Sequence, residues 1–205
     1  MRALWVIPLL GCTAAAAADF YSMEVSHQGA RYQMKVEVYL AAPPAEVYQV
    51  LTDYEHLTRI SSSVVKSNVT RRLDGGALVF TDTRICALLI CRHLRELQKL
   101  TESPPQDLSS VVVPQNGDNV KTGNGTLHLE AEGDGTRLMW QMSVEPDFWI
   151  PPLIGPALVS RSLRAEAARS TQGIERLARE RAGLPPLDGT EGHEDQKKDA
   201  DRSPP

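Results

Sequence analysis

The stretch VEPDFWIPPLIGPALVSRSL, residues Val144–Leu163, joins a strand pattern to a helix pattern through a linker that holds two aromatic residues. The apolar alternation at its start stops at Pro146, and a double proline precedes an apolar segment with helical spacing. Aromatic residues make up only 5% of the chain, so Phe148 and Trp149 are unexpected in a linker. They either seal a core or form the rim of a ligand pocket, and this stretch alone leaves both interpretations open.

The segments on either side of the linker predict one strand and one long helix. Four apolar residues of the preceding segment alternate with polar ones and share a face: Leu138, Trp140, Met142 and Val144. From residue 152 to about residue 177 the chain is compatible with a helix, and Leu158 belongs to its predicted inner stripe. Gly173 is the weak point of that helix, because glycine lowers helix stability.

The remaining patterns predict an α+β fold. Residues 32–40 alternate as a strand, and two short helical segments follow over residues 43–60. Between residues 64 and 144, turns rich in Gly and Pro separate six predicted strands, one of them Gly125–Ala131. The order indicates a curved antiparallel sheet of about seven strands, with two short helices after the first strand and the long C-terminal helix covering the apolar face.

Both ends of the chain differ in composition from this predicted domain at residues 32–182. Residues 1–18 have the layout of a signal peptide, with a basic start, a short apolar run and small residues before a cleavage site after Ala18. The sequence LLGC also resembles a lipobox, which would anchor the protein through a lipidated Cys12. Residues 19–31 are interpreted as an N-terminal extension, and residues 183–205 as a disordered polar tail. We expect export to a bacterial periplasm.

Charge and cysteine content narrow the functional classes. The net charge is −4, so there is no basic field to hold nucleic acid. In an oxidising compartment, Cys86 and Cys91 are expected to form a disulfide, with two buried thiols as the alternative. The histidines are scattered, and no metal-ligand spacing, nucleophile motif or cofactor-binding motif is present. The sequence therefore predicts no metal, no cofactor and no catalytic residues, and it leaves enzymatic activity undecided with a preference against it.

Several segments resemble the START-like superfamily of lipid-transfer, polyketide cyclase and birch-pollen-allergen-type proteins. They are APPAEVYQVLTDYEHL (Ala42–Leu57), EPDFWIPPLIGPALV (Glu145–Val159), the loop CALLIC (Cys86–Cys91) and GDGTRLMW (Gly133–Trp140). The resemblance covers about Tyr32–Arg179, and it is nearest to the exported bacterial members labelled polyketide cyclase or coenzyme Q-binding START domain. The sequence departs from that pattern at Leu127, where members usually carry a Trp after a Gly-x-Gly turn, which implies a wider or differently shaped pocket.

The resemblance implies a helix-grip fold with a tunnel between the sheet and the C-terminal helix. A ligand carrier with this fold would have the mouth of its tunnel beside Phe148. The residues predicted to contact a ligand are Tyr54, Leu138, Trp140, Met142, Phe148, Trp149 and Leu158. Two alternatives stay open: the Tyr54 hydroxyl enters the pocket or packs under the sheet edge, and Trp140 and Met142 form pocket wall or plain core. Three basic residues near the cysteine loop either hold a ligand head group or are solvated: Arg84, His93 and Arg95.

Three functions are compatible with this sequence. The first is a periplasmic carrier of a hydrophobic small molecule such as an isoprenoid, quinone or lipid, with transient membrane contact and no nucleic-acid partner. The second is a cyclase, aromatase or hydrolase that uses the same cavity. The third is an envelope interaction module whose cavity has collapsed. An open tunnel with an apolar lining would favour the carrier, and polar side chains that converge inside the tunnel would favour the enzyme. A solid core with an exposed apolar patch would favour the interaction module.

Overall fold

The computed structural model describes residues 19–87, 90–150, 153 and 155–187, which form one sheet, two α-helices and a short 3-10 helix. The elements are β1 (Asp19–Gln28), β2 (Arg31–Leu40), α1 (Pro44–Thr52), η1 (Leu57–Arg59), β3 (Val64–Leu73), β4 (Gly76–Ala87), β5 (Ile90–Ser103), β6 (Asp107–Val112), β7 (Val120–Glu132), β8 (Gly135–Pro146) and α2 (Gly155–Arg181).

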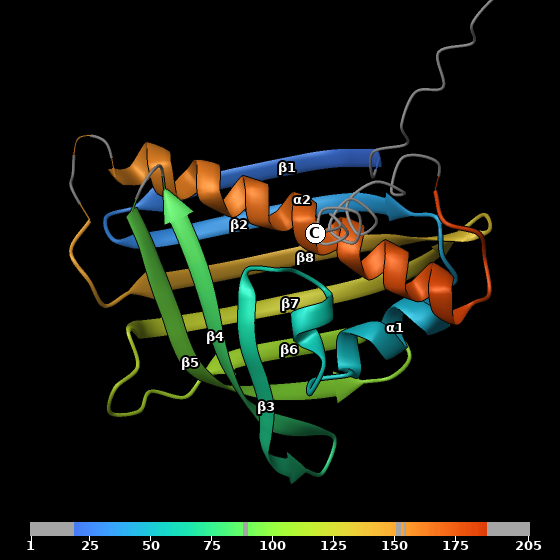
Figure 1. Ribbon diagram of the computed structural model, residues 1–205, viewed down its shortest axis with the longest axis horizontal. Coiled ribbons are helices and arrows are strands. Elements are labelled where there is room, and N and C mark those ends of the chain that lie inside the picture. The colour runs from blue at the N-terminus through green and yellow to red at the C-terminus, as the bar shows by residue number, and fades with distance from the viewer. Residues whose placement is uncertain (1–18, 88–89, 151–152, 154, 188–205) are drawn as a thin grey trace, which may run out of the picture.

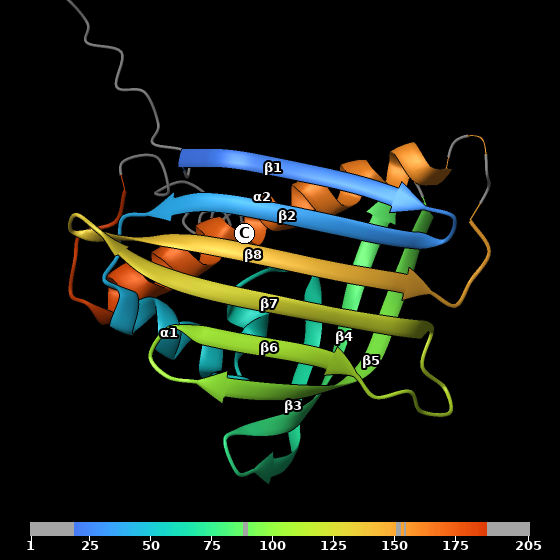
Figure 2. The ribbon, with the colours of Figure 1, turned by 180° about the vertical axis from the view of Figure 1, so that it is seen from behind.

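The sheet is antiparallel throughout and curves around α2. Its strand order is β1-β2-β8-β7-β6-β5-β4-β3, so β2 and then β1 extend the meander from β3 to β8 at its β8 edge. Figures 1 and 2 show α2 lying along one face of the sheet, while β4 and β5 run steeply across the direction of β2 and β8. This arrangement confirms the predicted α+β helix-grip fold with its long C-terminal helix and short helices after residue 40.

The core lies on the face of the sheet that α2 covers. Every second residue of β2 is buried, and its inward residues pair across to β8, with Met34 opposite Met142 and Val38 opposite Leu138. The pairing of apolar residues in register buries one face, which fixes the register, since a slip of one residue would expose the whole set. The alternation predicted for these two strands is therefore confirmed.

Two strands differ from the sequence-based expectation. Residues 19–28, expected to belong to an extension, form the edge strand β1, so the sheet has eight strands rather than about seven. Its pattern is weak because an edge strand contributes few core residues, here Phe20, Met23 and Val25, and because a register shift follows Phe20. The strand β7 begins at Val120, five residues before the predicted start at Gly125.

The helix α2 ends in a glycine cap and a short ordered extension. Gly183 has a left-handed φ of 67°, and the N–H of Leu184 donates to the carbonyl of Arg179. The guanidinium of Arg179 also donates to the carbonyl of Pro185. The rest of the predicted tail from residue 188, the predicted signal peptide at residues 1–18 and the lipobox Cys12 lie outside the described residues.

The C-terminal half of α2 is anchored to the segment that follows β2 and to η1. A β-carbon at Gly173 would overlap the backbone carbonyl of Ile60, so glycine here permits a close approach. Glu175 is buried, and its carboxylate accepts a hydrogen bond of 2.6 Å from the N–H of Ala41. Arg179 donates to the carbonyl of the same Ala41. The predicted weak point of the helix is thus a contact point.

Replacing Gly173 by alanine tests this contact. We expect Gly173→Ala to lower the free energy of unfolding by about 1–3 kcal/mol, because overpacking against backbone outweighs the gain of about 1 kcal/mol in helix propensity. The measurement is urea unfolding, with Gln172→Ala at the neighbouring exposed position as the control. A variant as stable as the parent, or more stable, would show that the approach of Ile60 is not tight.

The buried Glu175 generates a pH dependence of stability. Burial raises its pKa, and the Ala41 N–H and Arg179 offset part of this effect. Because the folded state then holds this proton more tightly than the unfolded state, its contribution to stability falls as pH rises above about 4.3. We expect the stability of Glu175→Gln relative to the parent, measured by urea unfolding, to be higher at pH 7.5 than at pH 5. A difference that stays constant over this range contradicts the assignment.

Candidate functional site

A cavity of about 320 Å³ lies between α2 and the inner face of the sheet. Its walls come from the strands β2 to β8, the helices α1 and α2 and the segment around η1. This volume is at the lower end of the range for small-molecule sites. The open cavity is the feature that distinguishes a binding domain from a solid helix-on-sheet core.

Small residues on facing elements create the space. On the inner face of β7, Gly123 and Gly125 lack side chains, and the neighbouring strand β6 presents Ser110. Across the cavity, α2 presents Ala167 and Ser170. A β-carbon at Gly125 would lie 3.0 Å from the Ser110 hydroxyl, so the two strands leave little room for a larger residue there. The resemblance places a Gly-x-Gly turn here, whereas Gly123 and Gly125 lie within β7 and form part of the cavity lining, which we call the cavity floor.

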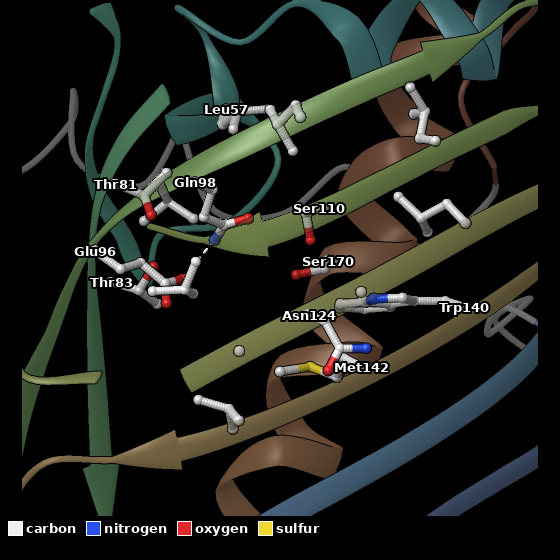
Figure 3. A pocket seen from close by; sticks show the side chains of 18 of the residues that line it. Leu57, Thr81, Thr83, Glu96, Gln98, Ser110, Asn124, Trp140, Met142 and Ser170 are labelled. Carbon is white, nitrogen blue, oxygen red and sulfur yellow. Dashed lines mark hydrogen bonds between the residues drawn. The ribbon is translucent and has the colours of Figure 1, made fainter. Parts of the chain in front are cut away.

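One wall of the cavity is apolar and contains the Trp of β8. Trp140 and Met142 point inward from β8, and Leu127 of β7 lies directly opposite Trp140 in the register. Figure 3 shows Trp140 and Met142 together on the side of the cavity where Ser170 of α2 also lies. At position 127, where the resemblance leads one to expect Trp, the smaller Leu lines the cavity.

The opposite wall carries a polar patch built by the β4–β5 hairpin. The patch consists of Thr81 and Thr83 of β4 and Glu96 and Gln98 of β5. Thr81 and Glu96 are directly opposite each other in the ladder, and Figure 3 shows all four side chains gathered on one side of the cavity. We call these four residues the polar patch.

Glu96 is the charged member of the polar patch. Its carboxylate accepts a hydrogen bond from the side-chain amide of Gln98, and within the described residues it has no ion-pair partner. Burial raises the pKa of Glu96; the Gln98 bond lowers it and the Asp118 charge raises it. A carboxyl group kept away from water in this way can donate or accept a hydrogen bond within an apolar space.

A second carboxylate, Glu166, lines the cavity from α2. It accepts hydrogen bonds from the guanidinium of Arg169 at 2.8 Å and from the Ser170 hydroxyl at 3.2 Å. Arg169 also reaches the Ser63 hydroxyl, which precedes β3, at 3.4 Å. Glu166 is thus charge-compensated by a half-exposed arginine outside the cavity lining, whereas Glu96 is not.

The structure brings three of the seven predicted contact residues to the cavity. Tyr54, Trp140 and Met142 line it. Leu138 is fully buried in the core beside the cavity, and Leu158 and Phe148 are half-buried without lining it. Trp149 is 79% exposed, so it does not plug the core. The expected mouth beside Phe148 is therefore not supported, and the ligand contacts themselves stay predictions.

The hydroxyl of Tyr54 is directed to a carboxylate. It donates a hydrogen bond of 2.8 Å to Glu102 on β5, and the ring is buried against Ala77 and Val79. Burial, followed by the bond to Glu102, raises the pKa of this phenol above its ordinary value. The Tyr54 hydroxyl therefore does not enter the pocket but is bonded to Glu102. Tyr54 is still one of the residues that line the cavity.

The cysteine prediction is confirmed at the tip of the β4–β5 hairpin. Cys86 and Cys91 form a disulfide between paired residues, and the hydroxyl of Ser162 on α2 donates to the carbonyl of Cys86 at 3.1 Å. The disulfide thus closes the hairpin where it meets the N-terminal half of the helix.

The basic residues near the cysteines do not line the cavity. Arg84, His93 and Arg95 are exposed, and the His93 ring lies 2.6 Å from the carboxylate of Asp82. Their arrangement agrees with the solvated-strand interpretation. Across the described residues, no three His, Cys, Asp or Glu side chains are grouped so that they could hold a metal ion. None of the described helices is long and apolar enough to cross a membrane.

Sequence reasoning missed the polar patch and the glycine floor. In RHLRELQKLT the leucines recur every third residue, so the strand alternation that turns Glu96 and Gln98 inward is hidden. The polar patch can be inferred from the pairing of β4 with β5. Once Val79 is placed inward, Thr81 and Thr83 follow on the same face, and their cross-strand neighbours include Glu96.

Comparisons with known proteins agree with this architecture. The chain resembles TTHA0849 from Thermus thermophilus with a TM-score of 0.61 and 19% identity, over 73% of this chain and 99% of that one. It resembles the Zhui aromatase/cyclase from Streptomyces sp. R1128 with a TM-score of 0.63 and 13% identity, over 76% and 99%. For human STARD10 the TM-score is 0.55 and the identity 12%, over 78% and 74%. At these identities the likeness shows the fold alone.

A family model matches most of the chain. No curated protein sequence matches this one. The model described as "Polyketide cyclase / dehydrase and lipid transport", in contrast, matches residues 31–180, which run from the start of β2 nearly to the end of α2. With the curved sheet, the covering helix and the cavity between them, this match shows that the chain belongs to the polyketide cyclase/dehydrase and lipid-transport family.

Proposed function

We propose that this protein binds and carries a hydrophobic small molecule, such as an isoprenoid, quinone or lipid, in the cavity beneath α2. The observation that carries the proposal is an open cavity with mainly apolar walls in a fold shared with lipid-transport proteins. Enclosing a ligand there removes its apolar surface from water, which stabilises the complex by ~25 cal/mol per Å². The same open cavity counts against the interaction module with a collapsed core.

Cyclase activity is the second candidate, and one observation favours it. A carboxyl group with a raised pKa, Glu96, faces the cavity, and such a group can serve as a general acid or base. A structurally similar protein is named an aromatase/cyclase. Binding is the better-supported function, because among the described residues the direct partner of Glu96 is the amide Gln98 rather than a second acid, base or nucleophile.

We also propose that the mature chain acts in the periplasm. The signal-like layout of residues 1–18 and the Cys86–Cys91 disulfide support export. Cleavage after Ala18 gives a free protein, and lipidation of Cys12 gives an anchored one. Trp149 and Leu153, at 79% and 95% exposure, are candidates for transient membrane contact. The intact mass of the protein recovered from each cell fraction distinguishes the free form from the anchored form.

The direct test of the proposed function is native mass spectrometry of the protein purified from its own compartment. Organic extraction and lipid analysis of the same sample then identify any bound molecule. A co-purifying hydrophobic compound at one per chain supports a carrier. An empty protein that takes up none of a panel of quinones, isoprenoids and lipids would refute the proposal.

Filling the cavity from β8 is expected to abolish binding. Met142 points inward, so Met142→Trp places a large ring in the space that a ligand needs, and we expect its Kd for an apolar fluorescent probe to rise by at least tenfold. The matched control is Met139→Trp, three residues earlier on the outer face of the same strand, which should leave the Kd within about threefold. Circular dichroism of both variants verifies folding. Equal binding by Met142→Trp and the parent would exclude this cavity as the site.

A further inference from the structure

We propose that the polar patch selects a ligand whose buried end is a neutral hydroxyl or carbonyl group and that it rejects ligands with an anionic end. This inference rests on the proposed function and specifies the ligand chemistry of the same cavity. It follows from the hydrogen-bonding groups that face the space, from the charges that line it and from the position of the patch opposite Trp140 and Met142.

The patch has hydrogen-bonding capacity that the protein does not use. The hydroxyls of Thr81 and Thr83 have no hydrogen-bond partner among the described residues, and one oxygen of Glu96 is likewise without one. The Gln98 amide uses one of its two N–H groups for Glu96. Enclosing these groups against a purely apolar ligand would leave them unsatisfied, at a cost of about 1–3 kcal/mol each. A hydroxyl or carbonyl at this place would satisfy several of them.

The charges in the cavity oppose an anionic ligand end. Of the two carboxylates that line the cavity, Glu166 is paired with Arg169, and Glu96 has no ion-pair partner among the described residues. No Lys, Arg or His side chain lines the cavity in the part of the chain that the structure describes. Asp118 adds a negative charge that acts on Glu96. A carboxylate or phosphate near Glu96 would meet like charge in a space with little water, where repulsion is weakly screened.

Neutral neighbours favour an uncharged group over a cationic one. The groups around Glu96 are two hydroxyls and an amide, which donate and accept hydrogen bonds without carrying charge. An ammonium group would have to give up its water to pair with Glu96, whose neighbours in the polar patch are uncharged, and buried ion pairs rarely repay that cost in full. A hydroxyl fits either protonation state of Glu96, since it both donates and accepts.

The experiment compares three ligands with one alkyl chain and different ends. The Kd values of 1-decanol, decanoate and decylamine are measured at pH 8 by displacement of the neutral dye N-phenyl-1-naphthylamine. The protein is the mature chain from cells that express the full sequence, with all bound lipid extracted. We expect the parent to bind decanol at least tenfold more tightly than decanoate.

Two substitutions of Glu96 test the mechanism of selection. Glu96→Gln keeps a hydrogen-bonding group without the charge, so decanoate should bind more tightly. The Kd of decanoate should then be within about threefold of the Kd of decanol. Glu96→Leu removes the polar group and should raise the Kd of decanol at least threefold. The control Glu130→Gln removes one negative charge from the exposed side of β7 and should leave all three values unchanged. Thermal unfolding of each variant verifies that it is folded.

Each remaining outcome overturns the inference in a recognisable way. Decanoate binding as tightly as decanol, decylamine binding most tightly, or an unchanged ratio in Glu96→Gln would refute selection for a neutral end while leaving a hydrophobic carrier intact. Failure of all three ligands to displace the dye, together with Met142→Trp behaving as the parent, would refute the proposed function as well.

Discussion

The fold depends on how α2 is fastened to the sheet. At its C-terminal half, Gly173 lets the helix meet the backbone of Ile60, and Glu175 and Arg179 both bond the main chain of Ala41. At its N-terminal half, the hydroxyl of Ser162 bonds the carbonyl of Cys86 at the hairpin tip. A helix held towards both of its ends spans the region between them, where the exposed Arg164 and Arg169 add bonds to Met23 and Ser63. The residues in that region need not fill the space below, which is why a cavity persists.

The cavity is stable because its walls are made of satisfied backbone. Paired strands cannot sink into the space without breaking hydrogen bonds of the ladder, and α2 cannot approach without losing its bonds to Ala41 and Cys86. The floor therefore tolerates Gly123 and Gly125, which would be costly in an ordinary core strand. Gly123 and Gly125 leave this part of the inner face without side chains, so Val112 and Ser110 of β6 approach it closely. Trp140 and Met142 lie beside it on the neighbouring strand β8.

The sequence predicted the fold more fully than it predicted the site. Strong alternation in β2 and β8 and the long apolar stripe of α2 reflect burial of a single face, which a sequence pattern records directly. The edge strand β1 was not predicted because few of its side chains are buried. Gly173 was interpreted as a defect, since a glycine required by contact with a distant carbonyl is identical in sequence to one that weakens a helix.

Four of the seven residues predicted to contact a ligand do not line the cavity, because burial and cavity lining are different properties. Leu138 is on the same face of β8 as Trp140, yet it is two residues nearer to the packed end, so it contributes to the core rather than to the cavity wall. Trp149 is exposed because the linker leaves the sheet before α2 begins. Alternation assigns a face to a residue, but its distance from the helix depends on tertiary curvature, which no local pattern contains.

The position of Glu96 shows how closely the chemistry of the cavity depends on register. β4 and β5 pair without interruption from Gly76 to Thr101 and are joined near their turn by the disulfide Cys86–Cys91. This cross-link opposes slippage of one strand along the other. A shift by one residue would carry Glu96 to the outer face and bring Leu97 inward, converting a polar wall into an apolar one. The disulfide therefore lies outside the cavity but favours the single register in which a carboxyl group and two hydroxyls face the ligand space.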